Sequence, residues 1–253
     1  MRNEEVIPTG IPELDGLLGG GLLEDSTLLV IYGTHSFGWA LAIEVFKKLI
    51  EKGGFGVVTD YSIPIYMLIR YGLAIRYDVL AEGFNKKLVI LDVFGSVSGV
   101  KTDYPFVYYI PGVDSTTFLS KAISVYKKIL ELAGNRRPVG LSITIDGMVD
   151  LFGEGATVKI LRKNIAIKMK AREEDRERPR PMNIFLLNRD RVSPGFIAWL
   201  SQYMEHIVEF QVTEKPGIEK MIVRKSLLPE FTPAQAIFRF SKGGFEIEIP
   251  LRL

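Results

Sequence analysis

The glycine-framed loop, residues 33–40, is the first segment whose residue types and spacing suggest chemistry. A phosphate-binding loop reads G-x-x-x-x-G-K-[ST]: its backbone N–H groups cradle phosphates, the lysine reaches the terminal ones and the hydroxyl ligates magnesium. Gly33 and Gly38 stand at that spacing, but Trp39 replaces the lysine and Ala40 replaces the hydroxyl residue. Losing two charge-assisted contacts removes roughly two to four decades of phosphate affinity. We therefore expect no bound ATP or Mg²⁺ and no ATP hydrolysis.

Ser36, in the same loop, offers a different chemistry, because a serine on a sharp strand-to-helix turn is the nucleophile of α/β-hydrolases. Three features disfavour this alternative. Thr34 replaces the leading glycine, about one strand precedes the turn instead of several, and the only later histidine, His206, is expected at a strand start. The altered phosphate loop is therefore the preferred interpretation.

Two aspartates that follow predicted strands, Asp60 and Asp146, are the remaining candidates for catalysis or metal binding. Asp60 stands where α/β active sites lie, but no base is identified to work with it. A lone aspartate such as Asp146 more often caps a helix or hydrogen-bonds a loop than holds a metal. We therefore predict no catalytic residue and no metal site. The expected pocket comprises Gly33, His35, Ser36, Phe37, Gly38 and Trp39, with Asp60 and Asp146 near its rim.

The elements that would position this pocket alternate between strands and helices. An apolar run at 27–32, the loop, an amphipathic stretch at 39–52 and a second run at 55–59 predict a βαβ unit. This alternation predicts an α/β fold with a mostly parallel sheet and helices on both faces. Further strands are expected at 88–93, 141–145, 184–187 and 207–212, and helices at 115–133 and 156–172.

The C-terminal part has a different pattern. Runs at 207–213 and 219–224 flank Lys215-Pro216-Gly217, and runs at 236–240 and 245–249 flank Lys242-Gly243-Gly244, which predicts antiparallel hairpins. We expect loops at 96–114 and 173–181. No linker composition interrupts the chain, so we predict a single domain over residues 1–253.

Several segments resemble the KaiC and RadA branch of the RecA-like ATPases, and together they cover nearly the whole chain. Thr9 to Gly21 resembles the segment before that branch's phosphate loop, and Leu88 to Asp92 resembles a strand common in KaiC-like domains. Ile143 to Asp146 resembles the Walker B strand, and Glu219 to Ile249 resembles the closing strands. The resemblance implies a RecA fold, ATP bound between neighbouring subunits and often a hexameric ring.

The positions that carry activity in that family depart from its pattern. Asp146 matches the magnesium-side acid, but the acid pair after the second strand is reduced to Asp60-Tyr61. The lysine-x-arginine that reaches a neighbour's nucleotide has only Val223-Arg224-Lys225-Ser226 as its nearest equivalent, out of register. We therefore expect a non-hydrolysing domain, and the ring itself is in doubt.

Composition excludes several classes of protein. With 47% apolar and 25% charged residues, a net charge of +2 and no cysteine, the chain reads as globular, without disulfides or thiolate metal sites. Its apolar runs fall far short of the about 20 residues that cross a membrane, so we expect no membrane partner and a cytoplasmic location. Abundant Lys, Arg, Glu and Ile resemble the composition of heat-adapted proteins.

Two surface segments bear on partners. Lys159 to Arg180 holds nine basic and four acidic residues without aromatic side chains, which favours a solvated helix and charged loop over a nucleic-acid site. Tyr104 to Pro111 is aromatic, and its ordinary role is core packing, although such loops also form partner surfaces. We expect a module that binds a protein or peptide. The alternatives are a nucleotide sensor or weak ATPase and a nucleic-acid accessory factor, and all three interpretations are compatible with a homo-oligomer.

Overall fold

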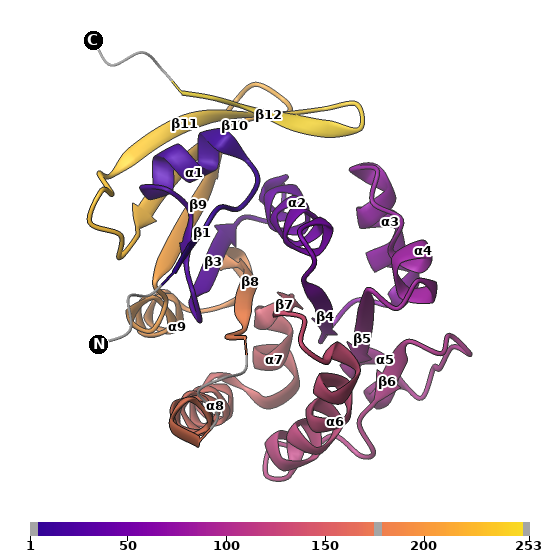
Figure 1. Cartoon of the computed structure of the whole chain (residues 1–253). Coiled ribbons are helices and arrows are strands. Elements are labelled where there is room, and N and C mark those ends of the chain that lie inside the picture. The colour runs from indigo at the N-terminus through magenta and orange to yellow at the C-terminus, as the bar shows by residue number, and fades with distance from the viewer. Residues whose placement is uncertain (1–4, 175–178, 250–253) are drawn as a thin grey trace.

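The fold is taken from a computed structural model that describes residues 5–174 and 179–249 (Figure 1). The helices are α1 Pro12–Leu18, α2 Gly38–Glu51, α3 Ile65–Ala74, α4 Val79–Phe84, α5 Val93–Ser98, α6 Phe118–Ala133, α7 Ile145–Phe152, α8 Glu154–Glu174, α9 Pro194–Gln202 and the 3₁₀ turn η1 Arg189–Arg191. The strands are β1 Val6–Ile7, β2 Leu22–Leu23, β3 Thr27–Tyr32, β4 Phe55–Asp60, β5 Leu88–Asp92, β6 Val107–Tyr109, β7 Pro138–Ile143, β8 Met182–Asn188, β9 His206–Val212, β10 Ile218–Lys225, β11 Ala234–Ser241 and β12 Gly244–Glu248.

Ten of the strands in the described residues form one sheet, in the order β12-β11-β10-β9-β3-β8-β7-β4-β5-β6. The pairs from β9 through β6 are parallel, whereas β9, β10, β11 and β12 pair antiparallel. The predicted α/β fold with antiparallel C-terminal hairpins is therefore confirmed. Because the parallel strands all end at one edge of the sheet, the loops after them meet there.

Helices cover both faces of the sheet, with α2, α3 and α4 on one side and α6 to α9 on the other (Figure 1). The central strand β3 shows why. Leu28 and Val30 pack in the core that contains α2, while Leu29 and Ile31 pack in the core that contains α7, α8 and α9. A strand buried on both faces is apolar along its whole buried length, which is the pattern of residues 28–31.

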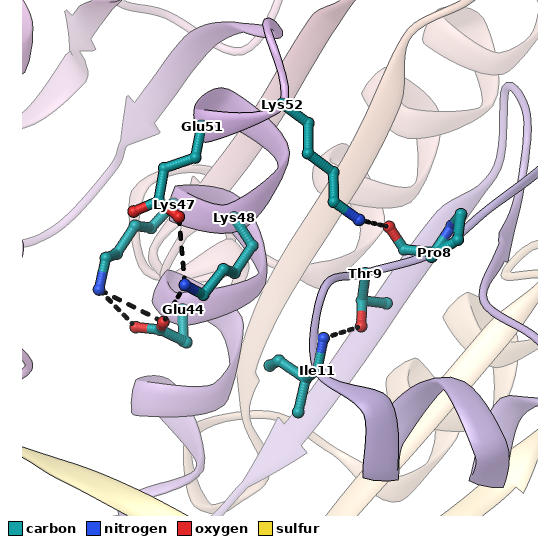
Figure 2. A network of polar contacts seen from close by, with 8 residues as sticks. All are labelled: Pro8, Thr9, Ile11, Glu44, Lys47, Lys48, Glu51 and Lys52. Carbon is teal, nitrogen blue, oxygen red and sulfur yellow. Dashed lines mark hydrogen bonds and ion pairs between the residues drawn. The ribbon is translucent and has the colours of Figure 1, made fainter.

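The N-terminal segment is fastened to α2 and to its own short helix. Both carboxylate oxygens of Asp15 accept backbone N–H bonds, from Thr9 at 2.7 Å and from Gly10 at 3.3 Å. Figure 2 shows the Thr9 hydroxyl accepting from the N–H of Ile11 and the Lys52 ammonium reaching a backbone oxygen of the segment. Glycine is required at position 19, where φ is +91° and a Cβ would lie 2.8 Å from the backbone of the β10–β11 connection. The segment that resembles the RecA-like branch therefore has a packing role.

Two expectations about elements are wrong. The strand expected at 141–145 ends at Ile143, because Thr144 adopts a left-handed backbone with φ of +62° and α7 begins at Ile145. Asp146 consequently lies in the first turn of a helix that the sequence analysis did not predict. The segment expected to be a loop at 96–114 contains the last three residues of α5 and the three-residue strand β6, both too short to give a sequence pattern. The charged loop expected at 173–181 falls partly on residues 175–178, which lie outside the described residues.

Candidate functional site

The glycine-framed loop connects β3 to α2, as predicted, and the protein itself occupies its backbone donors. The N–H of Phe37 donates to the carboxylate of Glu219 at 2.5 Å, and the N–H of Thr34 donates to the carboxylate of Asp190 at 2.7 Å. The N–H of Ser36 bonds to the Gly33 oxygen. Donors that would face an anion in a phosphate loop thus have acceptors within the chain.

Glu219 is the central residue of this arrangement. It lies on β10, is 2% exposed, and accepts a 2.5 Å bond from the Ser36 hydroxyl in addition to the Phe37 N–H. The Ser36 oxygen in turn accepts from the N–H of Gly38 at 3.0 Å. A carboxylate at a helix N-terminus is favourable because the unpaired N–H groups there carry partial positive charge.

The second glycine of the loop has a packing reason that is independent of phosphate. A Cβ at Gly38 would lie 2.6 Å from the ring of Phe210 on β9. A side chain at that position would force the ring or the helix start to move. The glycine at position 38 is therefore explained by packing against Phe210.

Trp39, which stands at the lysine position, packs in an aromatic cluster. Its ring lies 4.7 Å from that of Tyr71 on α3 and 5.7 Å from that of Phe240 on β11. Phe37 stacks on Phe240 with a centroid distance of 4.3 Å and an interplanar angle of 4°. We call Phe37, Trp39, Tyr71 and Phe240 the aromatic cluster. All four are partly buried, so the cluster keeps some contact with solvent, while Ala40 beside it is fully buried.

Asp146 is fully buried and held by protein groups. It accepts from the N–H of Asn188 at 3.0 Å, and Arg191 of η1 lies 2.8 Å away as an ion pair. Arg191 also pairs with Asp150 on α7. Burial raises the pKa of Asp146 despite the guanidinium. Asp146 thus links α7 to the end of β8 and to η1.

Asp60 ends β4, as predicted, and is also fully buried. One of its carboxylate oxygens accepts from the N–H groups of Ser62 at 3.2 Å and Ile63 at 3.1 Å. Its other oxygen has no hydrogen-bond partner among the described residues. Burial raises the pKa of Asp60 to about 7, the Ile63 N–H opposes that shift, and the neighbouring charge of Asp92 adds to it.

The residues of a serine-hydrolase site are not brought together. The Ser36 hydroxyl bonds to Glu219, and His35 is exposed. His206 begins β9, as predicted, but its Nε2 accepts from the N–H of Leu23 at 3.0 Å and its Nδ1 lies 3.1 Å from the Ser226 hydroxyl. Because Nε2 is an acceptor, the ring is neutral with its proton on Nδ1. The buried histidine therefore fastens the N-terminal segment to the sheet.

The two surface segments have defined positions. The basic stretch forms most of α8, where Arg172 pairs with Asp25 and Arg162 lies over the ring of Trp199 at 5.7 Å. The aromatic stretch contains β6, and its Tyr104 and Phe106 rings, just before that strand, stack 5.5 Å apart. Within the described residues, no group of three or more His, Asp or Glu is arranged to hold a metal, and no helix there is long and apolar enough to cross a membrane.

Sequence reasoning missed the residues that complete the site: Glu219, Asp190, Arg191 and Phe240. One signal was present for Glu219. In a strand with alternating side chains, position 219 shares a face with Met221 and Val223, which are both buried. A glutamate on a buried face requires a partner, and Ser36 and Phe37 are that partner. Asp190 and Arg191 follow β8 and carried no pattern of their own.

Comparison with known proteins places the fold. No family model and no curated protein matches the chain. Among solved structures, an uncharacterized protein PH0321 from Pyrococcus horikoshii, in complex with an unknown peptide, has a TM-score of 0.82 at 18% identity, covering 96% of this chain and 99% of that one. The KaiC-like protein PH0186 from Pyrococcus horikoshii OT3 has a TM-score of 0.68 at 19% identity, with coverages of 96% and 99%. The flagellar accessory protein FlaH from Methanocaldococcus jannaschii has a TM-score of 0.62 at 12% identity, with coverages of 94% and 95%. The fold is therefore RecA-like.

Proposed function

We propose that this chain is a non-hydrolysing RecA-like module that binds a protein or peptide partner. The observation that carries the proposal is the pairing of the glycine-framed loop with two carboxylates of the chain itself, Glu219 and Asp190. In a phosphate loop the same kind of N–H groups face the ligand. Here they stabilise the fold.

These residues do not fit a nucleotide phosphate. A phosphate at the loop would compete with Glu219 and Asp190 for their N–H donors and would be repelled by both carboxylates. Two like charges 4 Å apart repel by about 4 kcal/mol at an effective dielectric of 20. Trp39 supplies no compensating charge. We therefore infer that neither ATP nor Mg²⁺ is a cofactor of this chain, and the ion pair of Asp146 with Arg191 supports the same inference for the metal.

A binding role is supported by what occupies the lysine position. The aromatic cluster places apolar rings from α2, α3 and β11 together and leaves them partly exposed. Aromatic side chains contribute much of the energy at protein interfaces because they bury large areas at low entropic cost. The related PH0321 structure was solved with an unknown peptide. We infer a peptide or protein ligand rather than a nucleotide.

Calorimetry with MgATP tests the nucleotide part of the proposal. We expect no binding by the unmodified chain, and none by Trp39→Lys/Ala40→Thr, because Glu219 still holds the Phe37 N–H in that variant. Adding Glu219→Gln to the double variant removes one of the competing carboxylates. This triple variant is the first in which we expect weak binding of MgATP. Micromolar binding of MgATP by the unmodified chain would overturn the proposal.

Selection from a phage-displayed random peptide library tests the binding part. We expect enriched peptides whose affinity falls by at least about tenfold in Trp39→Ala, the loss that follows from removing one buried aromatic contact. Trp199→Ala on α9 is the matched control, because its ring lies over Arg162 on the other side of the sheet. A selection that enriches no peptide in repeated rounds, or peptides equally sensitive to both substitutions, contradicts a binding role for this cluster.

A further inference from the structure

The strand β12 stands at one end of the sheet. It pairs with β11 on one side, and no strand among the described residues pairs with its other side. Figure 1 shows the β11–β12 hairpin at the rim of the molecule, with its tip extending toward α3. An open edge of this kind presents unpaired backbone N–H and C=O groups, which are a template for another extended chain.

The register identifies which backbone groups face outward. Phe240 donates its N–H to the Gly217 oxygen at the end of β10, so its polar groups face away from β12. In an antiparallel pair, the residues opposite each other either exchange two hydrogen bonds or none. Phe245, opposite Phe240, therefore directs its N–H and C=O to the open edge, and Ile247, opposite Phe238, does the same.

The side chains of β12 form two rows. Phe245 and Ile247 are partly buried and pack against the core that holds α1 and α2. Ile249 continues the same row and is 47% exposed. On the other face Glu246 and Glu248 are both exposed, and Glu248 is paired with Arg239 at 3.0 Å. The edge thus has one apolar face and one acidic face.

We propose that an extended peptide segment of a partner protein pairs with the open edge of β12, with apolar residues beside Phe245 and Ile247 and basic residues beside Glu246 and Glu248. The proposal rests on the proposed function and deepens it by naming the site and the ligand chemistry. Main-chain bonds supply affinity in such added strands, and alternate side chains supply specificity.

A second copy of the chain fits this edge less well. Pairing β12 with another β12 sets Glu246 and Glu248 of one copy against the same acids of the other, and like charges across strands are destabilising. The opposite end of the sheet is a poorer template, since β6 has three residues where β12 has five. Charge and length therefore favour a basic peptide at β12.

The open edge is continuous with the aromatic cluster. Phe240 stacks on Phe37, approaches Trp39, and pairs in register with Phe245. A strand added at β12 would extend the face that this cluster belongs to.

A Trp199→Phe background leaves Trp39 as the sole tryptophan, so its fluorescence reports on binding at the edge.

The main-chain test uses a fluorescein-labelled heptapeptide of alternating lysine and valine and measures its anisotropy with the full chain. Ile247→Pro removes an outward N–H without touching the β11–β12 ladder, because proline is tolerated at that kind of edge position. Ile247→Ala is the matched control that shortens the side chain and keeps the N–H. We expect affinity to fall at least about tenfold in Ile247→Pro and within about threefold in Ile247→Ala, with both variants retaining the circular dichroism spectrum and melting profile of the folded parent.

The charge test uses Glu246→Lys/Glu248→Lys and a second probe that alternates glutamate and valine. We expect the affinity of the double variant for the lysine–valine peptide to fall by about tenfold or more, and its affinity for the glutamate–valine peptide to rise.

Equal binding of the lysine–valine peptide by the parent and Ile247→Pro would overturn the edge proposal and leave peptide binding itself intact. A parent that binds library peptides but not the lysine–valine probe would overturn the ligand chemistry. A parent that is dimeric in size-exclusion chromatography, with monomeric Ile247→Pro, would assign the edge to a second copy.

Discussion

The glycine-framed loop after β3 and the acidic end of β4 lie at the same edge of the sheet, yet their buried polar groups differ in their partners. In the loop, Glu219 accepts from both the Ser36 hydroxyl and the Phe37 N–H. At the end of β4, one oxygen of Asp60 accepts two backbone bonds, while its other oxygen and the nearby Ser62 and Thr144 hydroxyls lack partners among the described residues. Both oxygens of Glu219 therefore have hydrogen-bond donors, whereas the end of β4 keeps buried polar atoms without partners among the described residues.

The two sites contribute differently to the stability of the protein. A buried carboxylate whose two oxygens both accept hydrogen bonds, as in Glu219, contributes stability. Asp60 leaves one oxygen without a partner among the described residues, so burial disfavours its ionised form. The raised pKa of Asp60 expresses that cost. The loop is therefore a structural joint between β3, α2 and β10, whereas Asp60 carries an energetic cost that grows as pH rises from about 4 to about 7.

The largest expected loss of stability comes from removing Glu219, which links the glycine-framed loop to β10. Glu219→Ala leaves the Ser36 hydroxyl and the Phe37 N–H buried without an acceptor, so we expect the free energy of unfolding to fall by about 4 kcal/mol. Urea denaturation measures it. Lys220→Ala, the exposed neighbour on the same strand, should change stability by less than about 0.5 kcal/mol. Equal effects of the two substitutions would contradict the comparison.

Removing the charge of Asp60 should increase the free energy of unfolding, in contrast to the loss expected for Glu219→Ala. The folded chain holds the Asp60 proton up to about pH 7, whereas an unfolded chain releases it near its ordinary value, so Asp60 lowers stability as pH rises from 4 to 7. Asp60→Asn keeps a side-chain oxygen that accepts the Ser62 and Ile63 N–H bonds and removes the titration. We expect its stability relative to the parent to rise by about 3 kcal/mol between pH 4.5 and pH 8. A difference that does not change with pH would refute the raised pKa.

His206 should make the parent more stable as pH rises, which is the opposite of the effect of Asp60. The two pH dependences therefore partly cancel in the parent protein. Burial lowers the pKa of His206 to about 4, so the unfolded chain takes up a proton first as pH falls. We expect the parent's advantage over His206→Gln to shrink by about 2 kcal/mol between pH 7 and pH 5. Urea midpoints at four pH values measure it, and a constant advantage would argue against a neutral buried histidine.

The smallest expected effect concerns a partly buried cluster of ion pairs on the same helix and serves as the baseline for Glu219. Glu44 of α2 lies 3.2 Å from the Lys47 ammonium and 3.7 Å from that of Lys48 (Figure 2). Ion pairs of this kind contribute little, so Glu44→Gln should reduce stability by about 0.5 kcal/mol and by less in high salt. A loss as large as that of Glu219→Ala would show that the joint has no special weight.

Much of the fold was predictable because local patterns carry it. The apolar run of β3 and the helical spacing of α2 follow from short stretches of sequence, and their boundaries agree with the structure to within a residue. The start of α7 was not predictable, because it depends on Thr144 adopting a left-handed backbone that threonine rarely takes. This one conformation places Asp146 in the first turn of a helix, where the sequence pattern predicted the end of a strand.

The candidate site was predictable only in part. The sequence by itself determined that the glycine-framed loop keeps its two glycines and has tryptophan and alanine where a phosphate loop has lysine and a hydroxyl residue. Tertiary structure decided what the loop bonds to, since Glu219 lies 183 positions from Ser36 and reaches it because β10 pairs with β9 and β9 with β3. A missing side chain can be read from sequence, but the acceptor that satisfies a buried N–H depends on strand order, which no local pattern specifies.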